Sequence, residues 1–327
     1  MTSGWRGTVL RIAVSFLAIG CIFYFMRGKI GEAWGILRGG VSWQWFFVAV
    51  LTYFVANLVL AARLMLIFKT QNIYLSYGKS LYLSLLGLFF NLFLPSAIGG
   101  DVAKIYFAAK YSGKKIEATS AIIQDRLIGF VGLMLLALCG IGMVGQEFRD
   151  PRIVQMVYFF IGMMFFTVLF FGSRRFASRF SFLRVLIPSE KLKARLTELY
   201  HAMSGFKHHT VILVLALAIT FFAQVFFILV HYLLARSLAV EINIFLFFFL
   251  VPVVAIVSMM PSLGGLGVRE AGVLFFFKHF MGSEKALVFS LLLFVVIYGT
   301  SLGSGILYAL RGGLKSETIP NMEALKS

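Results

Sequence analysis

The chain has 327 residues, of which 60% are hydrophobic and 13% are charged, and its mean hydropathy is +0.93. Soluble proteins carry a charged fraction of about a quarter, and the long apolar runs and 37 Phe of this chain exceed what one soluble core buries. The composition therefore excludes a cytosolic enzyme and a disordered chain. In a soluble protein the net charge of +17 would suggest binding to nucleic acid. In a membrane protein the first explanation is that Lys and Arg are concentrated in the cytoplasmic loops.

Six apolar stretches are long enough to cross a bilayer, which takes about 20 residues. These full spans are predicted at about 9–26, 43–62, 119–145, 153–172, 211–235 and 286–310. The first stretch ends at Met26-Arg27 without a small-residue cleavage site. It is therefore interpreted as a retained helix and not as a signal peptide.

Two further apolar stretches, 80–111 and 244–280, are each interrupted by Pro, Ser and paired Gly. The interruptions read Leu94-Pro95-Ser96-Ala97-Ile98-Gly99-Gly100-Asp101 and Met260-Pro261-Ser262-Leu263-Gly264-Gly265-Leu266-Gly267. Pro removes a backbone donor and Gly has low helix propensity, so each stretch is predicted to form two half-helices joined by a break. The flanks of the first stretch are both basic: Arg63, Lys69 and Lys79 precede the break, and Lys104, Lys110, Lys114 and Lys115 follow it. Both flanks are thus predicted to be cytoplasmic, which makes the stretch a re-entrant hairpin.

The order of the segments predicts an inverted repeat. A span, a broken hairpin and a span occur twice, and three spans separate the two starts, so the second copy is inverted. The predicted domain is a single transmembrane unit, 1–312, with repeat A at about 43–145, a linking helix at 153–172, a basic cytoplasmic loop at 173–210, repeat B at about 211–310, and then a tail at 313–327.

Most loops obey the positive-inside rule, and loop 27–42, predicted outside, is the exception. The predicted fold is an all-α polytopic membrane protein with about six full spans and two re-entrant broken-helix hairpins, with both termini cytoplasmic.

Ionisable residues inside apolar segments are functional candidates because a charge in the bilayer is costly. Three such pairs occur: Asp101 with Lys104, Asp125 with Arg126, and Arg269 with Glu270. One interpretation is that each pair neutralises itself and is structural. The other is that free backbone N–H groups at the positive helix end after each break bind a phosphate, together with the nearby cations.

Three stretches, 91–104, 125–129 and 261–270, resemble the signature stretches of the flippase-like transmembrane family. That family includes the membrane portion of lysylphosphatidylglycerol synthase/flippase proteins. The resemblance covers residues 8 to 312 or so and implies a multi-pass inner-membrane protein that handles an anionic or lipid-linked substrate. Lys104 stands where Arg is common in the family, and the second break lacks a further Pro that synthase-linked members carry. No soluble aminoacyl-transferring domain follows in the sequence, so lysyl transfer by this chain alone is not expected.

The predicted substrate-binding residues lie at the two breaks and in the 125–126 pair. They are Asn91, Pro95, Ser96, Gly99, Gly100, Asp101, Lys104, Asp125, Arg126, Pro261, Ser262, Gly264, Gly265, Gly267, Arg269 and Glu270. The sequence has no nucleotide-binding loop of the P-loop type, no metal-ligand spacing and no nucleophile–base pair. We therefore expect no catalytic residue, no metal and no cofactor. Nucleic acid is not expected as a partner, because the basic residues lie in loops that topology already requires.

The leading functional hypothesis is a lipid transporter or flippase. Its substrate would be an anionic phospholipid or a lipid-linked molecule of the polyprenyl-phosphate or hopanoid type, and its partners would be membrane lipids. Two alternatives stay open. One is an intramembrane transferase that modifies a lipid head group with Asp125 or Glu270 as base. The other is an accessory membrane partner of a lipid-biosynthesis enzyme, and assembly as a homo-oligomer is also left open.

Overall fold

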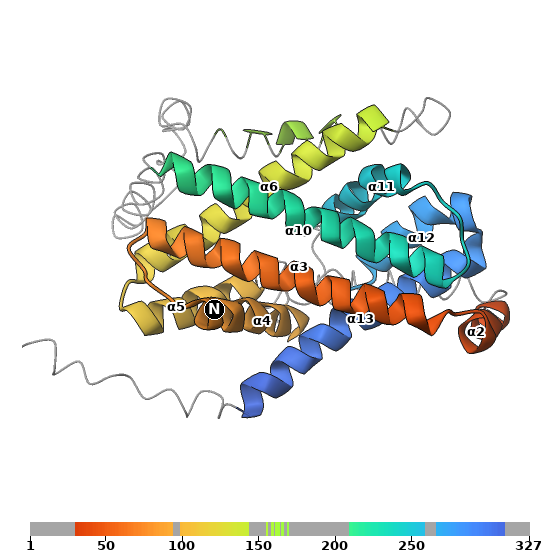
Figure 1. Cartoon of the computed structure of the whole chain (residues 1–327), viewed down its shortest axis with the longest axis horizontal. Helices are drawn as coiled ribbons and strands as arrows, with labels where there is room; N and C mark the ends of the chain where they lie inside the picture. Colours follow the sequence, from red (N-terminus) through yellow and green to blue (C-terminus); the bar gives the residue numbers. More distant parts are fainter. Residues whose placement is uncertain are drawn as a thin grey trace, which may run out of the picture.

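The computed structural model describes residues 30–93, 99–143, 209–258 and 266–310, together with isolated positions between 155 and 169. Within these ranges the regular structure is entirely helical, as predicted (Figure 1). The helices that position the site are α2 (Ile30–Gly39), α3 (Trp43–Thr70), α4 (Tyr77–Phe93), α5 (Gly99–Ser112), α6 (Lys115–Met143), α10 (Thr210–Ser237), α11 (Ile244–Val257), α12 (Val268–Met281) and α13 (Ser283–Leu310).

Four of these helices, α3, α6, α10 and α13, are long and apolar enough to cross a membrane. They overlap the spans predicted at 43–62, 119–145, 211–235 and 286–310, and they identify the molecule as a membrane protein. The predicted helix 9–26, the basic loop 173–210 and the tail 313–327 lie outside the described residues. Of the predicted helix 153–172, only scattered positions are described.

Helix α3 is longer than the sequence predicts. The apolar pattern predicts an end at residue 62, with Arg63 as a flanking cation, whereas the helix continues to Thr70. Arg63 is buried and ion-paired inside the helix bundle, and Leu64 and Phe68 beyond it are buried as well. The predicted boundary is therefore wrong, because a charge that has a partner inside the protein does not have to mark the end of a span.

Helices α3 and α10 form the central pair of the described fold. They run side by side in opposite directions across the middle of the molecule (Figure 1). At one end, the backbone N–H of Ser42, just before α3, donates to the carbonyl of Ser237 at the end of α10 at 2.7 Å. Tyr53 of α3 and Phe227 of α10 pack edge to face, with their ring centroids 5.6 Å apart. The two helices thus share an antiparallel, apolar interface.

Both interrupted stretches form two separate helices, as predicted. In the first, α5 folds back onto α4 so closely that a Cβ on Gly100 would overlap the backbone carbonyl of Gly87. In the second, α11 is followed by α12, which begins after Gly267. The predicted site residues that lie in the breaks themselves, outside the described residues, are Pro95, Ser96, Pro261, Ser262, Gly264 and Gly265.

Each interrupted stretch also packs against the last span of the other half. Helix α4 lies against α13, where the ring of Phe89 occupies the space that a Cβ on Gly305 would need. Helix α11 lies against α6, where a Cβ on Gly140 would be 2.5 Å from the carbonyl oxygen of Phe248 and 2.8 Å from the Cα of Phe249. A glycine on the long span permits close approach in both places, so the two halves are interleaved.

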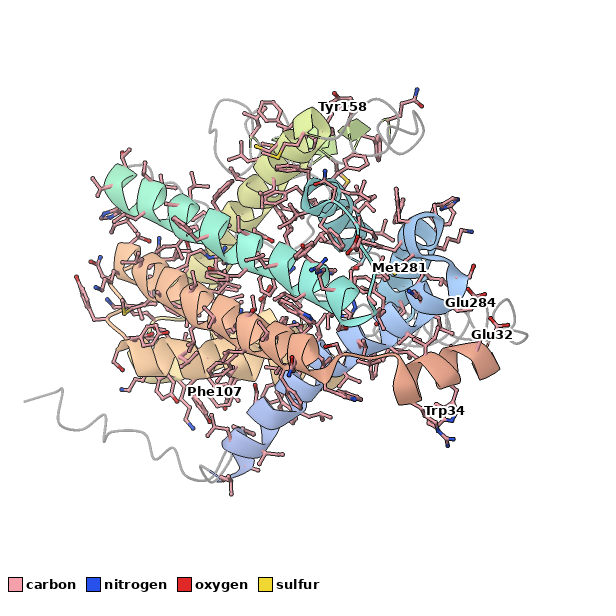
Figure 2. The ribbon with its side chains drawn as sticks, turned by 45° about the vertical axis from the view of Figure 1, so that its right-hand side comes forward. Glu32, Trp34, Phe107, Tyr158, Met281 and Glu284 are labelled. Atoms are coloured by element: carbon pink, nitrogen blue, oxygen red, sulfur yellow. The ribbon has the colours of Figure 1, made fainter. Side chains whose placement is uncertain are left out.

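The segment predicted as external loop 27–42 contains the short helix α2. Figure 2 labels Trp34 on this helix at the edge of the molecule. Ala33 is buried, Leu37 packs on the same core, and the guanidinium of Arg38 lies 5.1 Å from the Trp34 ring centroid. The connection between spans predicted here therefore contains a short helix that buries one apolar face while its polar face stays accessible, a pattern typical of interfacial helices.

Candidate functional site

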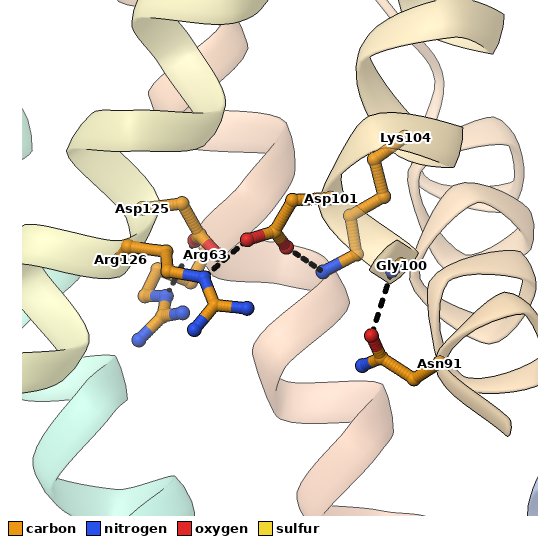
Figure 3. A network of polar contacts seen from close by, with 7 residues as sticks. All are labelled: Arg63, Asn91, Gly100, Asp101, Lys104, Asp125 and Arg126. Carbon is orange, nitrogen blue, oxygen red and sulfur yellow. Dashed lines mark hydrogen bonds and ion pairs between the residues drawn. The ribbon is translucent and has the colours of Figure 1, made fainter. Parts of the chain in front are cut away.

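Five charged side chains from three helices lie together beside the first break (Figure 3). They are Arg63 of α3, Asp101 and Lys104 of α5, and Asp125 and Arg126 of α6, and we call them the first charged cluster. Arg63, Asp101 and Asp125 are 7%, 7% and 8% exposed. The side chains of Lys104 and Arg126 are more accessible, at 19% and 30%.

The ion pairs of this cluster cross between helices. The Arg63 Nε donates to Asp125 Oδ1 at 2.8 Å. Asp101 lies between two cations: its Oδ2 accepts from Arg126 Nε, and its Oδ1 is 3.9 Å from Lys104 Nζ. Adjacent helical residues point about 100° apart, so Asp125 and Arg126 reach different neighbours. The self-neutralising interpretation is therefore wrong for this pair.

The first charged cluster has a surplus of positive charge. It contains three cations and two carboxylates, so its formal sum is +1. The Arg63–Asp125 pair is buried on both sides and is balanced. The surplus consequently belongs to the more accessible group formed by Lys104 and Arg126 around Asp101. This arrangement can attract one negative charge from a ligand.

The start of α5 differs from the sequence prediction. The N–H of Gly100 donates to Asn91 Oδ1 at 2.6 Å, so Asn91 of α4 caps α5. Gly99 and Gly100 are buried, and the Asp101 carboxylate in the first turn offsets the positive end of the helix dipole. The predicted free N–H group is thus already bonded at Gly100. Asn91 ties the two arms of the hairpin together, and the cations provide the attraction for an anion.

A second charged cluster follows the second break and has no surplus charge. Its acid, Glu270, uses both oxygens internally: Oε2 accepts from the N–H of Gly267 at 2.6 Å, and Oε1 from Arg269 Nη2 at 2.5 Å. The Arg269 guanidinium also lies 5.1 Å from the ring centroid of Tyr298 on α13. Gly267 has a φ of 81°, a conformation that favours glycine. The self-neutralising interpretation fits this pair.

Helix α3 passes both clusters. It contributes Arg63 to the first cluster, and its Tyr53 lies within electrostatic range of Arg269 in the second. These two α3 positions are ten residues apart, which corresponds to roughly 15 Å along a helix. The two clusters, which belong to breaks far apart in the sequence, therefore both lie beside α3.

Two members of the site are not predicted as such from the sequence. Arg63 is interpreted there as a flanking cation, and Thr220, which accepts from Arg63 Nη1 at 3.0 Å, is not a candidate. The sequence does contain a sign of the first: Arg63 is followed by Leu64, Met65, Leu66, Ile67 and Phe68. Because the apolar residues continue past this cation, Arg63 can lie within a span, where a charged side chain usually has a partner inside the protein.

Comparison with known proteins leads to the same family of membrane proteins that the three stretches of the sequence resemble. The family model described as "Lysylphosphatidylglycerol synthase TM region" matches residues 8–305, a range that contains both charged clusters and both breaks. Comparisons with curated proteins and with solved structures found no match. With most of its length covered by this model, the chain belongs to the family of the lysylphosphatidylglycerol synthase TM region.

Proposed function

We propose that this protein moves a lipid with an anionic head group, either a phospholipid or a lipid-linked molecule, between the two leaflets of the inner membrane. The observation that carries the proposal is the surplus positive charge of the first charged cluster. Charged groups within membrane segments are costly and tend to mark substrate pathways. A phosphate group that enters beside Lys104 and Arg126 would balance the charge of the cluster. The family to which the chain belongs is named after the membrane region of a lipid-modifying protein, which is consistent with a lipid substrate.

The interleaved arrangement of the helices supports a transporter. The antiparallel pairing of α3 with α10 is what an inverted repeat requires of its first members. The packing of α4 on α13 and of α11 on α6 is reciprocal as well: in each case the broken stretch of one repeat contacts the last span of the other. Inverted repeats with discontinuous helices are typical of secondary transporters, whose substrate sites lie where the broken helices meet. We therefore propose repeats at 43–145 and 211–310, with the broken stretches as re-entrant hairpins and both termini cytoplasmic.

The difference between the two clusters favours the first as the head-group site. At the second break the Glu270 carboxylate already binds both the Arg269 guanidinium and the N–H of Gly267. At the first break the nearby acid, Asp101, is shared by two cations. A ligand anion would thus meet a balanced pair at one break and an unbalanced group at the other. Binding of the phosphate at the first break is the lower-energy choice by simple electrostatics.

The proposal is tested by leaflet exchange in proteoliposomes. Purified protein is reconstituted with a fluorescent anionic lipid or, in parallel, a fluorescent zwitterionic lipid, and the label accessible to an external quencher is followed over time. We expect protein-dependent exchange of the anionic lipid, and a marked loss of that exchange in Lys104→Gln and in Arg126→Gln. Lys278→Gln removes an exposed cation far from the first break on the chain and should behave as the unmodified protein does.

The same experiment can refute the proposal. If exchange of every labelled lipid is equal in liposomes with and without protein, translocation is not its function. If exchange occurs but is equally fast in Lys104→Gln, Arg126→Gln and Lys278→Gln, the first charged cluster is not the head-group site.

A further inference from the structure

Arg63 joins three helices at one buried point. Its Nε donates to Asp125 of α6 at 2.8 Å, and its Nη1 donates to the hydroxyl of Thr220 on α10 at 3.0 Å. The Thr220 hydroxyl in turn donates to the carbonyl of Ala216 at 2.7 Å, so its lone pairs are directed at Arg63. The Arg63 guanidinium is consequently held from two sides, by a carboxylate and by a hydroxyl.

Helix α6 is shaped to receive these groups. A Cβ on Gly129 would lie 3.7 Å from Arg63 Nη1, so the guanidinium lies over a bare stretch of backbone. One turn on, the methyl of Thr220 occupies the space that a Cβ on Gly132 would need. Asp125, Gly129 and Gly132 follow each other at helical spacings of four and three residues, which places them on one face of α6. This face is turned toward α3 and α10.

The neighbouring residue, Arg126, is turned toward α5 and pairs with Asp101. The two adjacent charges of α6 thus serve different partners. Asp125 is ion-paired with Arg63 of α3, so its negative charge is already balanced there and does not offset the charge of Arg126. Asp101, Lys104 and Arg126 then sum to +1 among themselves. If Asp125 instead turned to Arg126, this surplus would be cancelled at the place where the head group is proposed to bind.

We propose that Arg63 is a positioning residue of the anion site: by holding the Asp125 carboxylate against α3 and α10, it preserves the positive charge that Lys104 and Arg126 offer to a ligand. The inference rests on the proposed function in that it takes the first charged cluster as the head-group site. It assigns to a residue of α3 a role in anion affinity that is separate from holding the helices together.

Binding of a soluble probe to the whole purified chain in detergent tests the inference. The probe is dihexanoyl phosphatidylglycerol, a phosphodiester with one negative charge, and dihexanoyl phosphatidylcholine is the zwitterionic control. Arg63→Gln should weaken binding of the anionic probe, and Asp125→Asn should strengthen it. Each change should be on the order of tenfold, the effect of one unit charge about 10 Å away at an effective dielectric constant of about 20. The double variant Arg63→Gln/Asp125→Asn should return to near the unmodified affinity.

A purely structural role predicts a different pattern. Both single variants would then lose affinity together with thermal stability, and Asp125→Asn would never bind more tightly than the unmodified chain. Arg63→Lys separates the two properties, because it keeps the charge beside Asp125 but reaches Thr220 poorly. We expect it to lower the unfolding temperature and to leave probe affinity within about twofold.

The outcomes distinguish this inference from the proposed function. If the unmodified chain binds the probe and Lys104→Gln weakens binding, while Asp125→Asn does not strengthen it, the role of Arg63 is refuted and the site stands. If the unmodified chain binds the anionic probe no better than the zwitterionic control, the head-group site is refuted, and the role of Arg63 with it.

Discussion

Replacing Gly87 by Ala moves the Lys104 ammonium without removing its charge. The alkyl stem of Lys104 lies across the bare backbone of Gly87 on α4: a Cβ at this position would be 3.2 Å from Lys104 Cγ and 3.3 Å from Cδ, and it would overlap Cε. Carbon atoms without a bond between them pack at about 3.5–4.0 Å. The stem is flexible, so the helix can keep its place while the end of the side chain moves aside by roughly 2 Å.

This displacement has a calculable effect on anion affinity. Two unit charges 4 Å apart attract by about 4 kcal/mol at an effective dielectric constant of about 20. At 6 Å the attraction falls to about 2.8 kcal/mol by the same relation. The loss of about 1.2 kcal/mol corresponds to a roughly eightfold weaker affinity. Gly87→Ala should therefore weaken binding of dihexanoyl phosphatidylglycerol by this factor, with little change in the unfolding temperature.

Gly78→Ala is the matched control, since it makes the same change on the same helix at a position where a Cβ would meet nothing within 4 Å. Both variants are measured by equilibrium binding of the probe in detergent and by thermal unfolding. If Gly87→Ala binds the probe as tightly as Gly78→Ala does, the position of the Lys104 ammonium does not determine affinity. A large fall in unfolding temperature in Gly87→Ala would equally contradict the reasoning, because it would mean that α4 and not the flexible stem had moved.

Three further predictions concern stability and can be checked by thermal unfolding in detergent. Gly100→Ala places a Cβ against the backbone of Gly87, which cannot move aside as a side chain does, so it should destabilise the protein by about 1–3 kcal/mol. Glu270→Ala leaves the mostly buried Arg269 guanidinium without its carboxylate and should destabilise the protein by up to about 3–5 kcal/mol. Glu270→Gln still caps α12 and should destabilise it less, and equal losses would refute the importance of the cap. Gly140→Ala should lower the unfolding temperature clearly and Gly142→Ala hardly at all, since a Cβ meets backbone atoms at the first position and open space at the second.

The elements of the fold can be predicted from the sequence because they depend on local features. Long apolar runs predict the spans that α3, α6, α10 and α13 occupy. Pro and paired Gly predict that the stretches 80–111 and 244–280 are interrupted, and each indeed forms two helices on either side of its break. A charge within an apolar run is rare enough to single out Asp101, Lys104 and Arg126, and these three do lie together.

The partners of these charges could not be predicted, because pairing depends on how each helix is rotated and on what lies beside it. Asp125 is followed directly by a cation in the sequence, yet it pairs with Arg63, 62 positions away. The bond by which the Asn91 side chain caps α5 could not be predicted either, because it depends on how α4 and α5 fold against each other. The loop-charge rule assigns Arg63 to a flank because it counts charges near span ends, and it does not consider a carboxylate on another helix.

The interleaving of the two halves has a mechanical consequence. Helix α4 is held by α13, and α11 is held by α6, each through a glycine that permits close contact. A rigid-body displacement of one half against the other would therefore have to separate α3 from α10 and, at the same time, pull both glycine contacts apart. A motion in which α4 moves with α13, and α11 moves with α6, keeps these contacts intact. The rigid units of the protein would then be drawn from both halves of the chain.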